Sequence, residues 1–259
     1  MHMSLRISLV ALALLSTFWS LGSFAAKPQL LKLQGRSAVD GYRAELEEAD
    51  WRWLREQGSL RLGASAPDYA PFEVTINDAY LEGITADFAL LLSQLLHIKV
   101  EVKRYPSRGA VIAALKQGNV DLLGTANDFE AADPQLLMSR AYAEDAPALV
   151  ARTGDGARLT ADLSGLRVAM LDHYLRPEAV EAVYPQARLQ LYPSTLSAIG
   201  AVAFGGADAY LGDSISASYL INNSYLNNVQ LAGFARLDVN AFGFAGCPGR
   251  RPPGRGRSR

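Results

Sequence analysis

The sequence has very few of the side chains that build disulfides and metal sites. Its 259 residues include one cysteine and three histidines. One cysteine cannot form an internal disulfide, and a thiolate zinc site needs several, so we expect neither a disulfide nor a metal. The nucleotide, hydrolase and peptidase motifs G-x-x-x-x-G-K-[ST], G-x-S-x-G and H-E-x-x-H are missing as well. We therefore expect no catalytic residue and no cofactor.

Net charge is also nearly absent, with 25 basic and 26 acidic side chains. Taking Arg6 and the five arginines of the last fourteen residues from the 25 leaves 19 basic against 26 acidic residues, so the body of the chain is acidic. An acidic body is not attracted to nucleic acid, which we exclude as a partner. The hydrophobic share of 49% is that of a globular chain, and the length suffices for one or two domains.

The two ends differ in composition from the body. Residues 1–25 predict a secretion signal, with Arg6 before an apolar stretch and small residues before the expected cut; an uncleaved membrane anchor is the alternative. Residues 246–259 contain arginine, glycine, proline and the cysteine but no aliphatic side chain. Three interpretations of this tail stay open: a reading frame lost near residue 245, a disordered linker, or a basic arm.

Between the ends, strand and helix patterns alternate at short intervals. Residues 26–50 are polar and weakly patterned, which predicts a leader or linker. From residue 51 onward, the alternation of short apolar runs with helical periodicity predicts α/β layers with a mostly parallel sheet. A helix is expected from about Thr85, and Ser107 is placed to cap the next one, which ends at Gly118.

One strand–helix–strand unit occurs twice. Tyr105-Pro106-Ser107 is followed by Gly118 and Asp121, and Tyr192-Pro193-Ser194 is followed by Gly205 and Asp208 at the same spacings. The unit before it recurs too. The strand at 60–63 and the loop at 68–69 correspond to the strand at 166–169 and the loop at 172–174. We therefore predict two lobes built on one plan, with a ligand cleft at the carboxyl ends of their strands.

The expected domain lies at 51–245. Lobe 1 is predicted at about 51–147 plus 237–245, with 148–151 as the strand that leaves it, and lobe 2 at about 152–236. Because the chain turns to the tail at residue 246, lobe 1 is expected to lack its closing helices.

The body of the sequence resembles the family 3 periplasmic solute-binding proteins, which have the type II two-lobed Venus flytrap fold. The resemblance rests on the runs 68–72, 83–88, 115–123, 139–142 and 206–210. More narrowly, 123–128, 192–198, 201–205 and 212–220 resemble the first of two tandem flytraps in BvgS-type hybrid sensor histidine kinases. The resemblance implies a two-lobed α/β fold, each lobe a mostly parallel sheet flanked by helices, in a periplasmic sensor whose parent is anchored in the inner membrane. It also implies a second flytrap and a kinase as partners, and it allows a homodimer.

The ligand implied by the resemblance depends on one departure from the family. Amino-acid-binding members hold the substrate carboxylate with an arginine in a Thr-x-x-Arg turn, but this chain has Thr125-Ala126-Asn127-Asp128 there. Asp213 matches the family's aspartate that holds the substrate amine. An aspartate without its arginine favours an amine or a neutral solute over ordinary amino acids, or allows that no small ligand binds.

Nine residues are candidates for the cleft. Most have a competing structural interpretation: Asp213 would also cap the helix that follows it, Asp68 suits a turn, and the aromatic residues suit a core. His173 is expected to lie at the surface, and a pH-sensitive contact in the cleft is the alternative. The candidates are Asp68, Tyr69, Phe72, Thr125, Asn127, Tyr142, Asp172, Tyr174 and Asp213.

Three functions follow from these expectations. The first is a non-catalytic sensing module, in which opening and closing of the lobes signals to a kinase. The second is a free-standing solute-binding subunit of an importer for an amine or amino-acid-like molecule. The third is an enzyme that uses a cleft carboxylate as acid or base, for which the sequence offers no motif.

Overall fold

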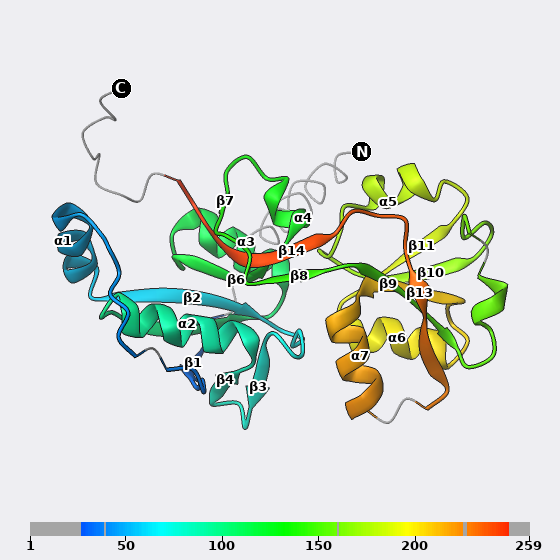
Figure 1. Cartoon of the computed structure of the whole chain (residues 1–259), viewed down its shortest axis with the longest axis horizontal. Helices are drawn as coiled ribbons and strands as arrows, with labels where there is room; N and C mark the ends of the chain where they lie inside the picture. Colours follow the sequence, from blue (N-terminus) through cyan, green and yellow to red (C-terminus); the bar gives the residue numbers. More distant parts are fainter. Residues whose placement is uncertain (1–26, 39, 160, 225–226, 249–259) are drawn as a thin grey trace, which may run out of the picture.

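The computed structural model describes residues 27–38, 40–159, 161–224 and 227–248. In these residues the strands form two sheets, and each sheet is the centre of a lobe. The lobes lie side by side, joined where β8 continues into β9 and where β13 continues into β14 (Figure 1). The expected signal peptide and residues 249–259 of the tail lie outside the described residues.

Lobe 1 contains nine of the described strands, in the order β3-β4-β1-β5-β2-β6-β14-β7, with β8 paired to β14. Its strands are β1 (Gln29–Leu33), β2 (Ser59–Ser65), β3 (Val74–Ile76), β4 (Tyr80–Glu82), β5 (Lys99–Tyr105), β6 (Leu122–Ala126), β7 (Leu137–Met138), β8 (Ala143–Asp145) and β14 (Asn240–Gly246). Its helices are α1 (Glu48–Gln57), α2 (Ile84–Leu95), α3 (Arg108–Gln117) and α4 (Asp128–Ala131).

Lobe 2 contains five of the described strands, in the order β11-β10-β12-β9-β13. Its strands are β9 (Pro147–Arg152), β10 (Arg167–Leu171), β11 (Arg188–Tyr192), β12 (Ala209–Asp213) and β13 (Val229–Phe234). Its helices are α5 (Pro177–Val183), α6 (Thr195–Ala203) and α7 (Ser214–Asn223), with a short 3₁₀ helix at Gly156–Arg158.

The two lobes repeat one plan in detail. Strand β2 lies between β5 and β6, parallel to both, as β10 lies between β11 and β12. In lobe 1, Asp121 accepts hydrogen bonds from the backbone N–H and the guanidinium of Arg61. In lobe 2, Asp208 accepts the same set from Arg167. The aspartate that recurs in the sequence is therefore one half of a two-pronged arginine pair that ties neighbouring parallel strands together.

The repeated serines begin equivalent helices. The Oγ atom of Ser107 accepts a hydrogen bond from the N–H of Ala110 at 3.2 Å and so caps α3. The Oγ atom of Ser194 accepts one from Ser197 at 3.1 Å and caps α6. Each cap satisfies a backbone N–H that the helix itself cannot pair, which explains why the serine recurs at this spacing.

Two expectations about the chain path differ from the structure. The segment 26–50, expected to be a leader, contributes β1 to the sheet of lobe 1, where β1 pairs with β4 and β5 and buries Leu31. The strand expected to leave lobe 1 belongs to lobe 2 instead, because β9 pairs with both β12 and β13. Both differences come from long-range strand pairing, which local sequence patterns do not encode.

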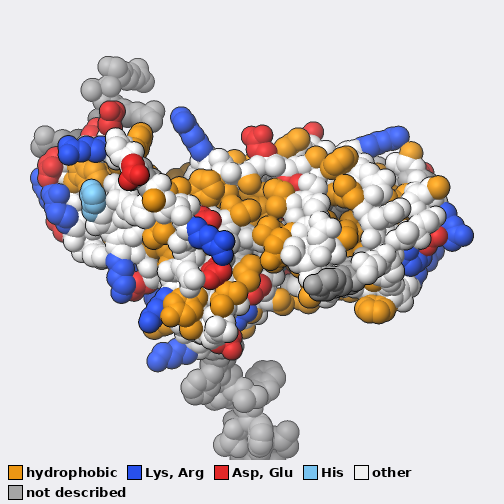
Figure 2. Space-filling model, turned by 60° about the horizontal axis from the view of Figure 1, so that its bottom comes forward, with side chains coloured by type: hydrophobic (Ala, Val, Ile, Leu, Met, Phe, Trp, Pro, Cys, Tyr) orange, Lys and Arg blue, Asp and Glu red, His pale blue; other side chains and the backbone are white. Residues whose placement is uncertain are grey.

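The surface carries charges of both signs. On the face shown in Figure 2, acidic and basic side chains are interspersed and hydrophobic side chains spread over the middle. In the part of the chain that is described, we find no helix with the length and apolar character needed to cross a membrane.

Candidate functional site

A small cavity lies between the lobes, at the carboxyl ends of the parallel strands. It has a volume of about 40 Å³. Lobe 1 contributes residues from the ends of β2 and β6 and from the start of α3, and lobe 2 contributes residues that follow β10 and β11. The lining residues are Ser65, Ala66, Pro67, Asp68, Tyr69, Arg108, Thr125, Asn127, Leu171, Asp172, His173 and Pro193.

Arg108, at the first position of α3, is the cationic side chain on the wall of lobe 1. Its Nε donates to the buried carboxylate of Glu130 at 2.8 Å, and its two terminal nitrogens donate to the carbonyls of Gly124 and Thr125 at 2.8 and 3.0 Å. The guanidinium thus fastens α3 to the end of β6. Three of its five N–H groups thus bind protein atoms of lobe 1, and Arg108 braces the wall.

A buried polar network lies behind this wall. The Thr125 hydroxyl donates to the carboxylate of Glu73 at 2.8 Å and lies 2.8 Å from the hydroxyl of Thr85. The Tyr142 hydroxyl accepts from the Thr125 N–H at 3.1 Å. Burial raises the pKa of Glu73 and raises the pKa of Tyr142 to about 12. The network fixes Thr125, whose backbone has a φ of 50°, an angle that a threonine rarely adopts.

The wall of lobe 2 presents a carboxylate and an imidazole. The side chain of Asp172 is half-exposed, and its Oδ2 lies 3.0 Å from Nδ1 of His173. The His173 ring packs against Phe129 of α4 with a centroid separation of 4.6 Å, and the His173 carbonyl accepts from the amide of Asn127 at 3.3 Å. These contacts join the two lobes, so the cleft is closed.

A third contact between the lobes involves Tyr69 and Asp213. The Tyr69 hydroxyl donates to Oδ2 of Asp213 at 2.7 Å, and Oδ1 of Asp213 accepts from the N–H of Ser216 at 2.6 Å. Asp213 therefore caps α7, which is the structural role that the sequence analysis gives as the alternative to solute binding. Its side chain is completely buried. Burial raises the pKa of Asp213 to about 6, while the hydrogen bonds from Ser216 and Tyr69 act in the opposite direction.

Five of the nine candidate residues line the cavity: Asp68, Tyr69, Thr125, Asn127 and Asp172. The carboxylate of Asp68 is held by its own lobe, since it accepts from the N–H and hydroxyl of Thr75 and from Arg104.

The other four candidates do not line the cavity. Phe72 and Tyr174 are fully buried in a hydrophobic cluster that also contains Phe242, and Tyr142 packs between Phe88 and Phe244. Asp213 lies behind Tyr69. The aromatic residues near strand ends thus serve the core, because the lobes pack on each other there and exclude water.

Sequence reasoning missed Arg108 and assigned His173 to the surface. The position of Arg108 could have been predicted from the sequence, because Arg108 directly follows the capping Ser107. It therefore begins a helix at the carboxyl end of a parallel strand. The inward position of His173 had no such signal, because it depends on the contact with Phe129 of the other lobe.

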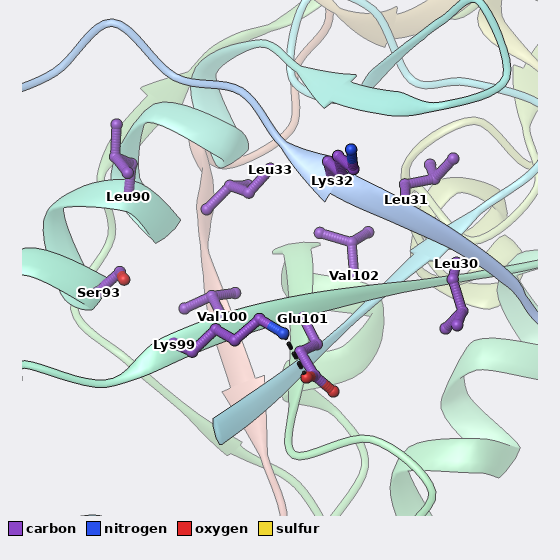
Figure 3. A pocket seen from close by; sticks show the side chains of 10 residues that line it. All are labelled: Leu30, Leu31, Lys32, Leu33, Leu90, Ser93, Lys99, Val100, Glu101 and Val102. Atoms are coloured by element: carbon purple, nitrogen blue, oxygen red, sulfur yellow. Dashed lines mark hydrogen bonds and ion pairs between the residues drawn. The ribbon is translucent and has the colours of Figure 1, made fainter. Parts of the chain in front are cut away.

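Lobe 1 has a larger groove that faces away from the cleft, with a volume of about 420 Å³. Figure 3 shows leucines of β1 and valines of β5 around it, with Leu90 and Ser93 of α2 on one side. Among the described residues we find no group of three or more His, Cys, Asp and Glu side chains placed to hold a metal ion.

Comparison with known proteins agrees with this architecture. Residues 61–234 match the family of bacterial extracellular solute-binding proteins, family 3. The chain is 39% identical over 239 residues to the virulence sensor protein BvgS of Bordetella parapertussis, covering 92% of this chain and 19% of that protein. It is 24% identical to the sensor protein EvgS of Escherichia coli K12, covering 83% of this chain and 18% of EvgS. The chain thus spans about a fifth of the length of these relatives.

Solved structures give the same result. The crystal structure of the B. pertussis BvgS periplasmic domain matches 85% of this chain and 42% of its own with a TM-score of 0.70 at 37% identity. The BvgS periplasmic VFT2 domain matches 80% of this chain and 87% of its own with a TM-score of 0.72 at 25% identity. Arginine-bound ArgBP from T. maritima, at 18% identity, covers 76% of this chain and 92% of its own with a TM-score of 0.63 and shares the fold. The chain therefore belongs to the family 3 bacterial extracellular solute-binding proteins and is a two-lobed flytrap similar to the periplasmic sensor domain of BvgS.

Proposed function

We propose that this chain is the periplasmic sensing module of a BvgS-like sensor histidine kinase, in which opening and closing of the cleft is the signal. The observation that carries the proposal is a closed cleft between two lobes joined by two chain crossings, in a chain 39% identical to a sensor protein. Such a pair of lobes has two discrete arrangements, and a partner that senses one of them can be switched. The parent protein would be anchored in the inner membrane.

The importer subunit is not favoured. The relatives at 37–39% identity are sensor proteins, whereas arginine-binding proteins match at 18–24% and indicate the fold alone. The partners that follow from the sensor proposal are a second flytrap domain and a kinase in the parent protein, with a homodimer as the assembly.

The chemistry of the cleft supports an amine or a neutral solute over an amino acid. Asp172 lines the cavity, and the guanidinium of Arg108 is held by Glu130 and two carbonyls. The described cavity of about 40 Å³ is far below the roughly 300–1,000 Å³ of a typical ligand pocket, so we infer that the lobes separate to admit a solute. Tyr69, Thr125, Asn127 and Asp172 are the residues that would then meet the solute.

A chimeric sensor tests this function. Residues 27–248 would replace the first flytrap of B. pertussis BvgS, and kinase autophosphorylation would be measured in membranes. Cysteines at Phe129 and His173, whose rings lie 4.6 Å apart, allow the closed cleft to be locked with a short bis-maleimide after Cys247 is replaced by serine. Because the cleft is already closed, we expect the lock to leave autophosphorylation at the level of the single-cysteine controls. Aspartates at the same two positions place like charges across the cleft, should force it open and should change autophosphorylation at least severalfold. A kinase that is unchanged in the aspartate variant would contradict the proposal.

A further inference from the structure

Tyr69 of lobe 1 reaches across the junction of the lobes to Asp213 of lobe 2. Its loop follows β2 in lobe 1, and its hydroxyl lies 2.7 Å from Oδ2 of Asp213 at the end of β12 in lobe 2. The other carboxylate oxygen is bound by the N–H of Ser216. Both oxygens of this buried carboxylate are therefore hydrogen-bonded to protein, and the partner that joins the lobes is a side chain of the chain itself.

The Tyr69 ring is held in place by other aromatic rings. It packs against Phe72 with a centroid separation of 5.5 Å and against Phe242 of β14 with one of 6.2 Å. These ring contacts restrict the orientation of the Tyr69 side chain, so little side-chain entropy is lost when the bond forms. Next to it, the cavity holds only about 40 Å³.

We propose that Tyr69 is an internal ligand of Asp213, which holds the lobes closed and which a solute must displace in order to bind. The inference rests on the proposed function, in that the cleft is taken to be the sensing site. In this arrangement the closed state is the resting state. A solute then acts by competing with the phenol for the carboxylate and by forcing the lobes apart to make room.

The surroundings of Asp213 add a dependence on pH. The titratable groups that face it are Tyr69 of lobe 1, Tyr174 and Tyr210 of lobe 2, and Asp145 of β8. The tyrosines are neutral in this range because burial raises their pKa well above 10, and the Asp145 carboxylate disfavours a second negative charge.

Burial raises the pKa of Asp213 to about 6 in the closed state, and water restores it toward its ordinary value of about 3.9 when the cleft opens. The closed state binds the proton more tightly, so acidification from pH 7 to pH 5 shifts the equilibrium toward closure.

Energy transfer between dyes on the two lobes tests the internal ligand in the full chain. Cysteines at the exposed positions Ala113 of α3 and Glu181 of α5 would carry the dyes in a Cys247→Ser background. We expect the wild-type protein to be closed without any added solute at pH 7. Tyr69→Phe keeps the ring and removes only the hydroxyl, and it should shift the equilibrium toward the open state by roughly tenfold to a hundredfold, the range for a hydrogen bond to a charged group.

Tyr192→Phe is the matched control, because the Tyr192 hydroxyl donates its hydrogen bond to Gln190 of its own strand in lobe 2, and it should leave the dye distance unchanged. Asp213→Asn keeps a hydrogen-bonding group opposite Tyr69 and removes the charge, so it should stay closed and lose the response to pH. That loss tests the proposal even if Tyr69→Phe does not fold. An open wild-type protein at pH 7, a Tyr69→Phe variant as closed as wild type, or an unchanged pH response in Asp213→Asn would each overturn it. The readout is the geometry of this chain alone, so it is independent of the kinase measurement in the chimera.

Discussion

Replacing Asp213 by asparagine is expected to stabilise the protein at neutral pH, although it alters a fully buried, doubly hydrogen-bonded residue. Asparagine is as good a helix cap as aspartate, so the bond from the Ser216 N–H is kept. Its amide can pair with the Tyr69 hydroxyl. What the substitution removes is a negative charge in a fully buried site beside a second carboxylate, Asp145.

The size of the effect follows from the raised pKa. Asp213 titrates at about 6 in the folded protein, against about 3.9 in an unfolded chain. The difference corresponds to about 3 kcal/mol of folding free energy that the wild-type protein loses as the pH rises from about 4 to about 6. Asparagine does not titrate. The variant should therefore gain up to about 3 kcal/mol at pH 7, or roughly 6–12 °C in Tm, and gain nothing at pH 4.

Urea unfolding of both proteins at pH 4, 5, 6 and 7 measures this difference. Asp208→Asn is the control of opposite sign, because the hydrogen bonds from Arg167 lower the pKa of Asp208 to about 2. That variant should lose stability at pH 7, and the loss should shrink as the pH falls toward 2. A variant Asp213→Asn that is less stable than wild type at pH 7, or a stability difference that does not change between pH 4 and pH 7, would refute the reasoning.

Three further substitutions test the packing around the cleft, all by urea unfolding. Arg108→Met should cost about 3–5 kcal/mol, because it strands the Glu130 carboxylate in a buried site; a cost below 1 kcal/mol would mean that the pair is not buried in solution. Ser107→Ala removes the cap of α3 and should cost about 1 kcal/mol, and a neutral result would contradict the capping bond. Gly212→Ala places a methyl group against the buried Tyr210 hydroxyl and should cost about 1–3 kcal/mol, whereas a stable variant would show that the ring can move.

The local features of this fold could be predicted from the sequence because each depends on residues close together in the chain. The spacing of Ser107, Gly118 and Asp121, repeated later in the chain, indicated two lobes of one design, and the capping role of the serine followed from its chemistry. The strand expected before the tail is β14. Part of the cavity wall could also be predicted from the sequence, since residues that follow parallel strands meet at one edge of a sheet.

The tertiary structure alone decided how the two lobes meet. Strand β1 joined lobe 1 and β9 joined lobe 2 because their partners lie far away in the sequence, and no local pattern specifies such pairing. The same applies to the site. Only closure of the lobes brings the Tyr69 hydroxyl to Asp213, 144 positions later in the chain, and turns a candidate solute-binding carboxylate into a buried group that already has a partner. The sequence thus determined which groups stand at the cleft, and the packing of one lobe against the other determined which of them remain free to bind, because burial and hydrogen bonding are properties of the assembled fold.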